Sequence, residues 1–234
     1  MRPEPAERSR ALRRLSSPAE LVEFLAARGP FELSVWDFDG VVCDSEPLQA
    51  DAYLRVLDGR GIRPGPGFFD GYVGLTEPQI WDRIRADHGL VADRAELVRE
   101  RQEILRPSLL RARPNWFVRP ALDAVAAAGT RSVIVSSGNL AMIEPYLAAW
   151  SLEGSFDDVS ALGAVAGPTK RERMTSLLES ARGRTVLLED VDHYLALGRK
   201  HGAVVIGVSH GLTEGPLTNA DAVLMAGRPP PIAG

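Results

Sequence analysis

Cysteine is almost absent from this sequence: Cys43 is the only one among 234 residues. This excludes a disulfide framework and a zinc site built from several thiolates. No stretch is long and apolar enough to span a bilayer, and the first sixteen residues hold no apolar signal-peptide core, so we expect an unexported cytoplasmic protein with no membrane partner. Positive charge is not in excess either. A net charge of −4 and a pI near 5.7 argue against a broad surface for nucleic acid.

Apolar residues are plentiful, at 45% of the chain, which is enough for one large domain or a domain with a smaller insert. Five arginines lie in the first sixteen residues, but Glu4 and Glu7 interrupt them. We expect a frayed tail there rather than an organellar address or a partner-binding arm. Ser17-Pro18-Ala19-Glu20 reads as a helix start, and Gly29-Pro30 as its end. Residues 1–30 are therefore predicted to form a tail and a short helix.

Two carboxylates, Asp37 and Asp39, directly follow an apolar run and precede Gly40. If the run is a strand, its period of two points both acids to one side, and the glycine lets the backbone turn tightly beside a ligand. Carboxylates so close together repel each other, so either a divalent cation lies between them or one holds a proton. The alternative is that both merely end a strand and solvate a turn.

The remaining chain divides into two patterns. Residues 46–112 carry three helical signals with no strand between them, and so predict an all-helical block. After Pro114, helices alternate with short apolar strands near residues 132–135, 158, 185–188 and 203–208. Such alternation predicts a parallel sheet with covering helices. The expected fold class is therefore α/β, with residues 46–112 as an all-helical block within it.

Polar residues follow several of the expected strands, and ligands of open parallel sheets bind at that edge. Acids, hydroxyls and a lysine brought to one edge match what phosphoryl transfer requires, namely charge neutralisation, hydrogen-bond donors and a nucleophile. Lys170 begins a helix between two core strands and is included for that reason. The candidate residues are Asp37, Asp39, Gly40, Ser136, Ser137, Lys170, Glu189 and Asp190.

Four ordered motifs now resemble those of the haloacid dehalogenase superfamily of phosphohydrolases, in the branch that includes phosphoglycolate phosphatases and β-phosphoglucomutases. The resemblance covers about residues 31–225. It implies a Rossmann-like core made of residues 31–45 and 113–234, with residues 46–112 inserted as a helical cap. The motifs are Asp37-x-Asp39-Gly40, Ser136, Lys170 and Glu189-Asp190.

The resemblance implies that Asp37 is the nucleophile and forms an aspartyl-phosphate, with Asp39 as general acid and then base. It also implies Mg²⁺ held by the Asp37 carboxylate, the Asp39 backbone carbonyl and Asp190, with Glu189 ligating or orienting from nearby. Ser136, Ser137, Lys170 and Gly40 are expected to bind phosphate. Asp39 and the Glu189-Asp190 pair argue against haloalkanoate dehalogenation, which needs neither a metal nor a second acid.

Departures from the family pattern bear on the substrate. Gln49 stands where relatives that isomerise sugar phosphates carry a histidine, and Glu77 stands where an arginine would grip a second phosphate. Both favour hydrolysis of a monophosphate over mutase chemistry. Gln49, Tyr72 and Thr76 are expected to contact the leaving group, whereas Trp81 is expected to pack inside the cap.

Three readings compete: a Mg²⁺-dependent phosphatase of small phosphate esters, a mutase or phosphonate hydrolase on the same scaffold, and a noncatalytic relative. The absence of lysine from residues 46–112 argues against phosphonate cleavage through a Schiff base. A monomer or homodimer is expected. The sequence leaves open whether Asp192 and His193 belong to the site, although a solvent-exposed helix start is expected for His193.

Overall fold

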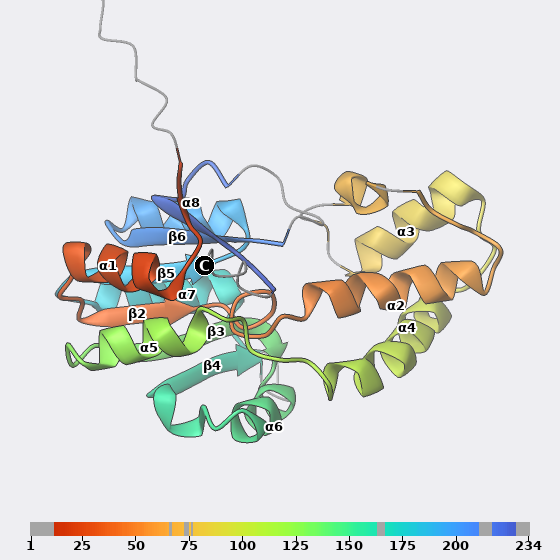
Figure 1. Cartoon of the computed structure of the whole chain (residues 1–234). Helices are drawn as coiled ribbons and strands as arrows, with labels where there is room; N and C mark the ends of the chain where they lie inside the picture. The colour runs from red at the N-terminus through yellow and green to blue at the C-terminus, as the bar shows by residue number, and fades with distance from the viewer. Residues whose placement is uncertain are drawn as a thin grey trace, which may run out of the picture.

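The structure is a computed structural model that describes residues 12–65, 67–72, 75, 77–162, 167–210 and 217–227. Within these ranges one sheet of seven parallel strands runs in the order β1-β7-β6-β5-β2-β3-β4 (Figure 1). The strands are β1 (Arg13–Leu15), β2 (Leu33–Trp36), β3 (Arg131–Asn139), β4 (Asp158–Leu162), β5 (Thr185–Glu189), β6 (Val204–Ser209) and β7 (Ala222–Met225). The central strands β2 and β5 are fully buried, as expected when helices cover both faces of a sheet.

Five helices cover the sheet: α1 (Pro18–Arg28), α5 (Val118–Ala126), α6 (Leu140–Ala149), α7 (Lys170–Ser180) and α8 (Asp192–Lys200). Alternate residues of β2 enter different cores. Trp36 packs into the core shared with α1, α5 and α6, whereas Leu33 and Val35 pack into the core shared with α7 and α8. The result is a three-layer α/β/α unit, which confirms the predicted fold class. No helix of the described ranges is both long and apolar enough to cross a membrane.

The amino-terminal segment differs from the expected tail. Arg13–Leu15 is strand β1, paired in parallel with β7, and Leu15 is buried in the core. The sequence hides this strand because it is three residues long, carries two arginines and lies at the sheet edge. The expected helix after it is present as α1: Ser17 Oγ accepts the Glu20 N–H at 3.2 Å, and Pro18 occupies the first turn.

A helical subdomain follows β2 and stands beside the carboxyl edge of the sheet (Figure 1). It consists of α2 (Glu46–Asp58), the 3-10 helix η1 (Phe68–Tyr72), α3 (Glu77–His88) and α4 (Arg94–Leu109). Its helices enclose a hydrophobic core of their own. Trp81 lies in that core with no exposed surface and its ring centroid 5.0 Å from that of Tyr53, so the packing prediction for Trp81 is confirmed. The exact domain boundaries stay a prediction.

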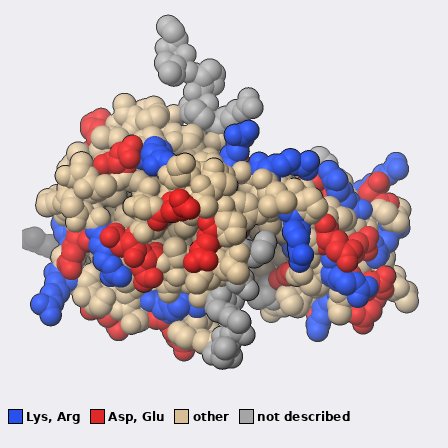
Figure 2. Space-filling model, turned by 90° about the horizontal axis from the view of Figure 1, so that it is seen from below, with Lys and Arg blue, Asp and Glu red and all other residues tan. Residues whose placement is uncertain are grey.

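Acidic and basic side chains are interspersed over the face drawn in Figure 2, including the part formed by the helical subdomain. Some charged side chains of the helical subdomain form pairs along or between helices, such as Asp51–Arg55 and Asp82–Arg94. Interspersed charges of both signs give a surface without a strong field of one sign.

Candidate active site

Three carboxylates meet where the two central strands end. Asp37 follows β2, and Glu189 and Asp190 lie at the end of β5, its parallel neighbour. The Asp37 N–H donates to the Leu188 carbonyl at 3.0 Å, which continues the pairing of the strands into the site. One oxygen from each of the three carboxylates lies within 4.8 Å of the others. Asp37 and Glu189 are buried, so this proximity is built into the sheet.

Lys170 joins this group from the first turn of α7. Thr169 fixes the helix start through a capping box: its hydroxyl accepts the Glu172 N–H while the Glu172 carboxylate accepts the Thr169 N–H. The buried Lys170 Nζ lies 2.8 Å from Asp37 Oδ2 and 2.8 Å from Glu189 Oε2. One cation therefore bridges carboxylates from two strands.

The acids outnumber the cation, and their pKa values reflect this. Burial, followed by repulsion from Glu189, raises the pKa of Asp37 to about 7, although Lys170 acts in the opposite direction. Burial also raises the pKa of Glu189 to about 7 against the influence of Lys170, with Asp190 adding to the rise. Burial alone would lower the pKa of Lys170, but the two carboxylates beside it raise it. A further cation among these oxygens would relieve the remaining repulsion.

Asp39 is held apart from the three clustered carboxylates. Its Oδ1 accepts a hydrogen bond from the Ser45 hydroxyl at 3.0 Å, and the Ser45 oxygen in turn accepts the Gly40 N–H at 3.2 Å. Ser45 precedes α2 but its hydroxyl caps no backbone N–H of that helix. Burial raises the pKa of Asp39, which favours its protonated form. Ser45 lies at the start of α2, a position that gives no sign in the sequence of its contact with Asp39.

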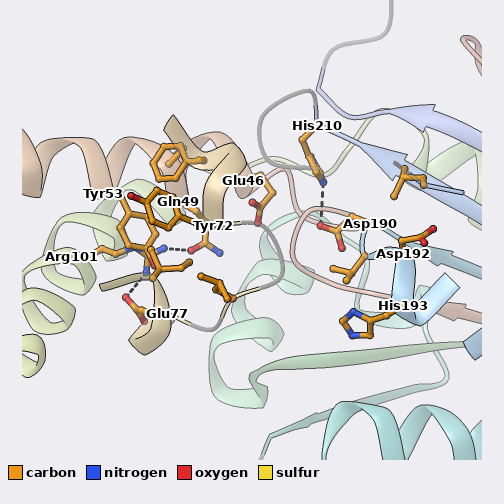
Figure 3. A pocket seen from close by; sticks show the side chains of 16 residues that line it. Glu46, Gln49, Tyr53, Tyr72, Glu77, Arg101, Asp190, Asp192, His193 and His210 are labelled. Atoms are coloured by element: carbon orange, nitrogen blue, oxygen red, sulfur yellow. Dashed lines mark hydrogen bonds and ion pairs between the residues drawn. The ribbon is translucent and has the colours of Figure 1, made fainter. Parts of the chain in front are cut away.

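Gly40 and His210 crowd Asp190. Gly40 has φ +77°, and a Cβ atom added to it would lie 2.6 Å from Asp190 Oδ2 and 2.7 Å from His210 Nε2. His210 follows β6, and its Nε2 lies 3.4 Å from the same Asp190 oxygen (Figure 3). Sequence reasoning missed His210, although it follows a core strand as the other candidates do. Only glycine fits at position 40 without displacing Asp190.

Gly40→Ala is expected to destabilise the protein and displace Asp190, because alanine at this position meets both strain and a steric clash. Gly61→Ala is a matched control: Gly61 has φ +73°, but nothing lies within 4 Å of its added Cβ. The free energy of unfolding of the control should fall by about 1 kcal/mol, because alanine is strained in the left-handed backbone conformation. Urea denaturation should show a clearly larger fall in the free energy of unfolding for Gly40→Ala. Calorimetry should show that this variant binds Mg²⁺ more weakly than the wild type. Equal losses for the two variants would contradict the crowding at Asp190.

The two candidate serines have different surroundings. Ser136 is buried near the end of β3, and its Oγ accepts the Gly138 N–H at 2.8 Å. A Cβ on Gly138 would lie 3.1 Å from Ser136 Oγ and 3.5 Å from Asp39 Oδ2, so Gly138 is flanked by both side chains. Ser137 is exposed. The structure therefore places Ser136 and Asp39 on either side of Gly138, whereas the side chain of Ser137 is exposed to solvent.

A cavity of about 550 Å³ lies between the helical subdomain and the sheet edge. The expected substrate residues Gln49 and Tyr72 line it together with Asp190 (Figure 3). Thr76 lies outside the described residues. Arg101 of α4 also lines the cavity, and sequence reasoning missed it because a helical arginine usually lies in solvent.

The residues left open in the sequence, Asp192 and His193, both line this cavity. The Asp192 carboxylate accepts hydrogen bonds from the Thr218 hydroxyl and from the backbone and side-chain N–H groups of Asn219, at 2.8–3.0 Å. It therefore anchors the turn before β7. His193 is exposed, in agreement with its prediction, and its ring centroid lies 4.1 Å from that of Tyr194 with the two rings tilted at 45°.

Comparison with known families decides the class of this site. The family model for haloacid dehalogenase-like hydrolases matches residues 34–208, three quarters of the chain. The chain belongs to this hydrolase family. The match begins in β2, just before Asp37, and ends in β6, so it contains every candidate residue of the sheet edge. The resemblance inferred from the four motifs is thereby confirmed.

Solved structures share the fold at low identity. A haloacid dehalogenase-like protein of unknown function from Agrobacterium tumefaciens is 23% identical, with a TM-score of 0.68 over 84% of this chain and 93% of its own. A predicted phosphoglycolate phosphatase from Haemophilus somnus is 16% identical, with a TM-score of 0.65 over 84% and 95%. CbbY from Rhodobacter sphaeroides, in complex with xylulose-(1,5)bisphosphate, is 17% identical, with a TM-score of 0.63 over 83% and 94%. The comparison with curated proteins found no match.

Proposed function

We propose that this hydrolase is a Mg²⁺-dependent phosphatase that cleaves a small-molecule phosphomonoester through an aspartyl-phosphate on Asp37. The observation that supports it most is the group of Asp37, Glu189, Asp190 and Lys170, in which three carboxylates lie together and the buried Lys170 pairs with two of them, Asp37 and Glu189. A buried excess of acid is costly in free energy and is retained where a metal or a reaction needs it. The neighbours described as phosphatase and as a sugar bisphosphate complex support the same class of ligand.

The donor set fits Mg²⁺, which prefers a few carboxylate oxygens together with water and phosphate. Asp37 and Asp190 would hold the ion, with the backbone carbonyl of Asp39. Glu189 is engaged by Lys170 through Oε2 and by the Val191 N–H, 3.2 Å from Oε1, so we assign it to orienting Lys170. When bound, the ion supplies positive charge that neutralises the transferring phosphoryl group.

In the first step an Asp37 carboxylate oxygen attacks phosphorus, a new P–O bond forms, and the bond between phosphorus and the ester oxygen breaks. Asp39 gives its proton to the departing alcohol, a role that its raised pKa and its separation from the clustered carboxylates favour. Lys170 holds Asp37 in place, and its charge, with a hydrogen bond from Ser136, stabilises the phosphoryl oxygens.

In the second step water attacks the aspartyl-phosphate, and Asp39, now ionised, takes the proton from that water. The P–O bond to Asp37 breaks, phosphate leaves and the Asp37 carboxylate is restored. The helical subdomain would act as a lid that excludes bulk water and selects the alcohol. A small phosphate ester is therefore the proposed ligand. The cytoplasmic location and the oligomeric state, monomer or homodimer, stay predictions.

Mutase chemistry is less well supported. It requires a residue in the helical subdomain that moves a proton on the sugar, and Gln49 carries no titratable group. In the structure the Gln49 side-chain oxygen accepts a hydrogen bond from Arg101. Hydrolysis needs no such group, because water is the second substrate.

A generic aryl phosphate tests the proposal. We expect the protein to release phosphate in the presence of Mg²⁺, and we expect removal of the metal with a chelator to lower kcat at least about 10³-fold, since the ion neutralises the charge at the reacting phosphate. Restoring Mg²⁺ should restore the rate. Phosphate release that is unaffected by chelation would contradict the metal assignment, and no release with Mg²⁺ would contradict the phosphatase.

A further inference from the structure

Among the described residues that line the cavity on the side of the helical subdomain, Arg101 is the buried cation. Its Nη1 lies 2.8 Å from Glu77 Oε1, and its Nη2 donates to the Gln49 side-chain oxygen. Its guanidinium carbon lies 4.1 Å from the centroid of the Tyr53 ring (Figure 3). The guanidinium is therefore paired along two edges and stacked on one face. The single positive charge of Arg101 is neutralised by the single negative charge of Glu77.

Besides Arg101 and Glu77, the described lining holds three acids, Glu46, Asp190 and Asp192, and two histidines, His193 and His210. Figure 3 shows Glu46 between the Arg101 group and Asp190. Burial, followed by repulsion from Asp190, raises the pKa of Glu46 to about 7, although His210 acts in the opposite direction. Even with a divalent cation at the sheet edge, the space for the leaving group is bounded by three carboxylates, by His193, by His210 beside Asp190, and by an arginine already neutralised by Glu77.

A second anionic group on the substrate would meet this wall at close range. Like charges brought together in a partly desolvated site cost several kcal/mol, which corresponds to a large loss of affinity. Hydroxyl groups have the opposite effect, because carboxylate and amide oxygens accept their hydrogen bonds. Tyr53, Phe69, Tyr72, Leu75 and Ile80 add apolar surface beside these acceptors. The chemistry of the wall suits an uncharged polyhydroxy alcohol.

We propose that the leaving alcohol of the substrate is an uncharged polyol, and that Glu77, by neutralising Arg101, selects against esters carrying a second phosphate or carboxylate. This specificity rests on the proposed function. Glu77 acts here as a specificity residue through its ion pair. The competing possibility is that Arg101 leaves Glu77 to bind a second anion, and the experiment below distinguishes the two.

Two pairs of esters isolate the effect of the added charge. Glycerol 1-phosphate and 3-phosphoglycerate differ in a hydroxymethyl against a carboxylate group, as do sorbitol 6-phosphate and 6-phosphogluconate. Their dissociation constants are measured by calorimetry with Mg²⁺ on Asp37→Asn, which keeps the cavity but cannot turn the esters over. We expect the neutral member of at least one pair to bind at least about 10-fold more tightly than its acidic partner.

Glu77→Gln, added to the same background, frees the charge of Arg101 and should bring the two members of that pair to within about 3-fold. Glu100→Gln is the control: Glu100 also pairs with an arginine of the subdomain, Arg60 at 2.6 Å, but neither residue lines the cavity. This control should keep the preference of its parent. Circular dichroism checks the fold of each variant.

Tighter binding of the acidic esters, binding of none of the four, or a preference that Glu77→Gln leaves unchanged would overturn the proposal. The preference of Asp37→Asn for neutral over acidic esters tests the proposal by itself. The proposal can therefore be refuted even if Glu77→Gln fails to fold. Turnover of an aryl phosphate by the wild type is measured separately. Its absence would refute the phosphatase, whereas a wrong preference with normal turnover would refute only the specificity.

Discussion

Asp37→Asn is expected to lower kcat for phosphate release at least about 10⁴-fold and, in metal-free buffer at pH 8, to make the protein more stable. The loss of activity follows because an amide cannot attack phosphorus and form the acyl phosphate. Asparagine keeps the shape of the side chain, and its amide can still contact the neighbours of Asp37. The variant should therefore keep its fold, as measured by circular dichroism.

The gain in stability follows from the raised pKa of Asp37. An ordinary aspartate has a pKa near 4 in the unfolded chain, whereas burial and Glu189 raise the folded value to about 7. Between these values the folded state binds more protons than the unfolded state, so the free energy of unfolding falls as pH rises. Removing this carboxylate should raise stability at pH 8 by at least about 1 kcal/mol, or about 2–4 °C in Tm, and by less at pH 5.

Asp123→Asn is the control, because it removes an exposed carboxylate from α5 without touching the site. It should leave both kcat and the pH dependence of Tm as in the wild type. Residual activity of Asp37→Asn within about 100-fold of the wild type would remove Asp37 from the role of nucleophile. A Tm below that of the wild type at pH 8 would show that Lys170 compensates the Asp37 charge fully.

Lys170→Met is expected to have the largest effect on stability. It leaves Asp37 and Glu189, each 2.8 Å from Nζ, without their shared cation in a buried site. Removing one partner of a buried ion pair typically costs about 3–5 kcal/mol. The penalty should be greater at pH 8 than at pH 5, because protonation of the two acids removes the repulsion. Urea denaturation at the two pH values measures it.

A second substitution shows whether Lys170→Met lowers stability because the cation is missing or because the packing is disturbed. Glu189→Gln removes one of the two acids that Lys170 compensates, so the double variant Lys170→Met/Glu189→Gln should recover at least about 1 kcal/mol relative to Lys170→Met alone. Lys200→Met, at an exposed position near the end of α8, should change stability by less than about 0.5 kcal/mol. If the stability losses of Lys170→Met and Glu189→Gln simply add in the double variant, the ion pairs of Lys170 contribute little to the loss caused by Lys170→Met.

The sequence was sufficient for the centre of this site because regular local rules produce it. Asp37, Glu189 and Asp190 each follow an apolar run, and parallel strands bring such positions to one edge. Lys170 was recognisable by the helix start before it. No contact among these residues had to be known in advance, because the alternation of strands and helices supplied their proximity.

Other features depend on contacts between distant segments, which local patterns do not contain. The partners of Arg101, namely Gln49 and Glu77, lie 52 and 24 residues away on two other helices. His210 reaches Asp190 only because β6 pairs with β5. Ser45 carried the signal of a helix start, yet its hydroxyl binds Asp39. In each case tertiary structure gave a polar residue a use that its neighbours in sequence do not reveal.

The pairing of β1 with β7 has a consequence for how much of the chain forms one cooperative unit. The family match, residues 34–208, omits β1, α1 and β7. A fragment cut to that match would expose the apolar strand β6 as an open edge, and would uncover the core face that Phe24 and Leu25 of α1 protect. Open apolar edges promote self-association. The shared family region is thus smaller than the smallest piece of this protein expected to stay soluble by itself.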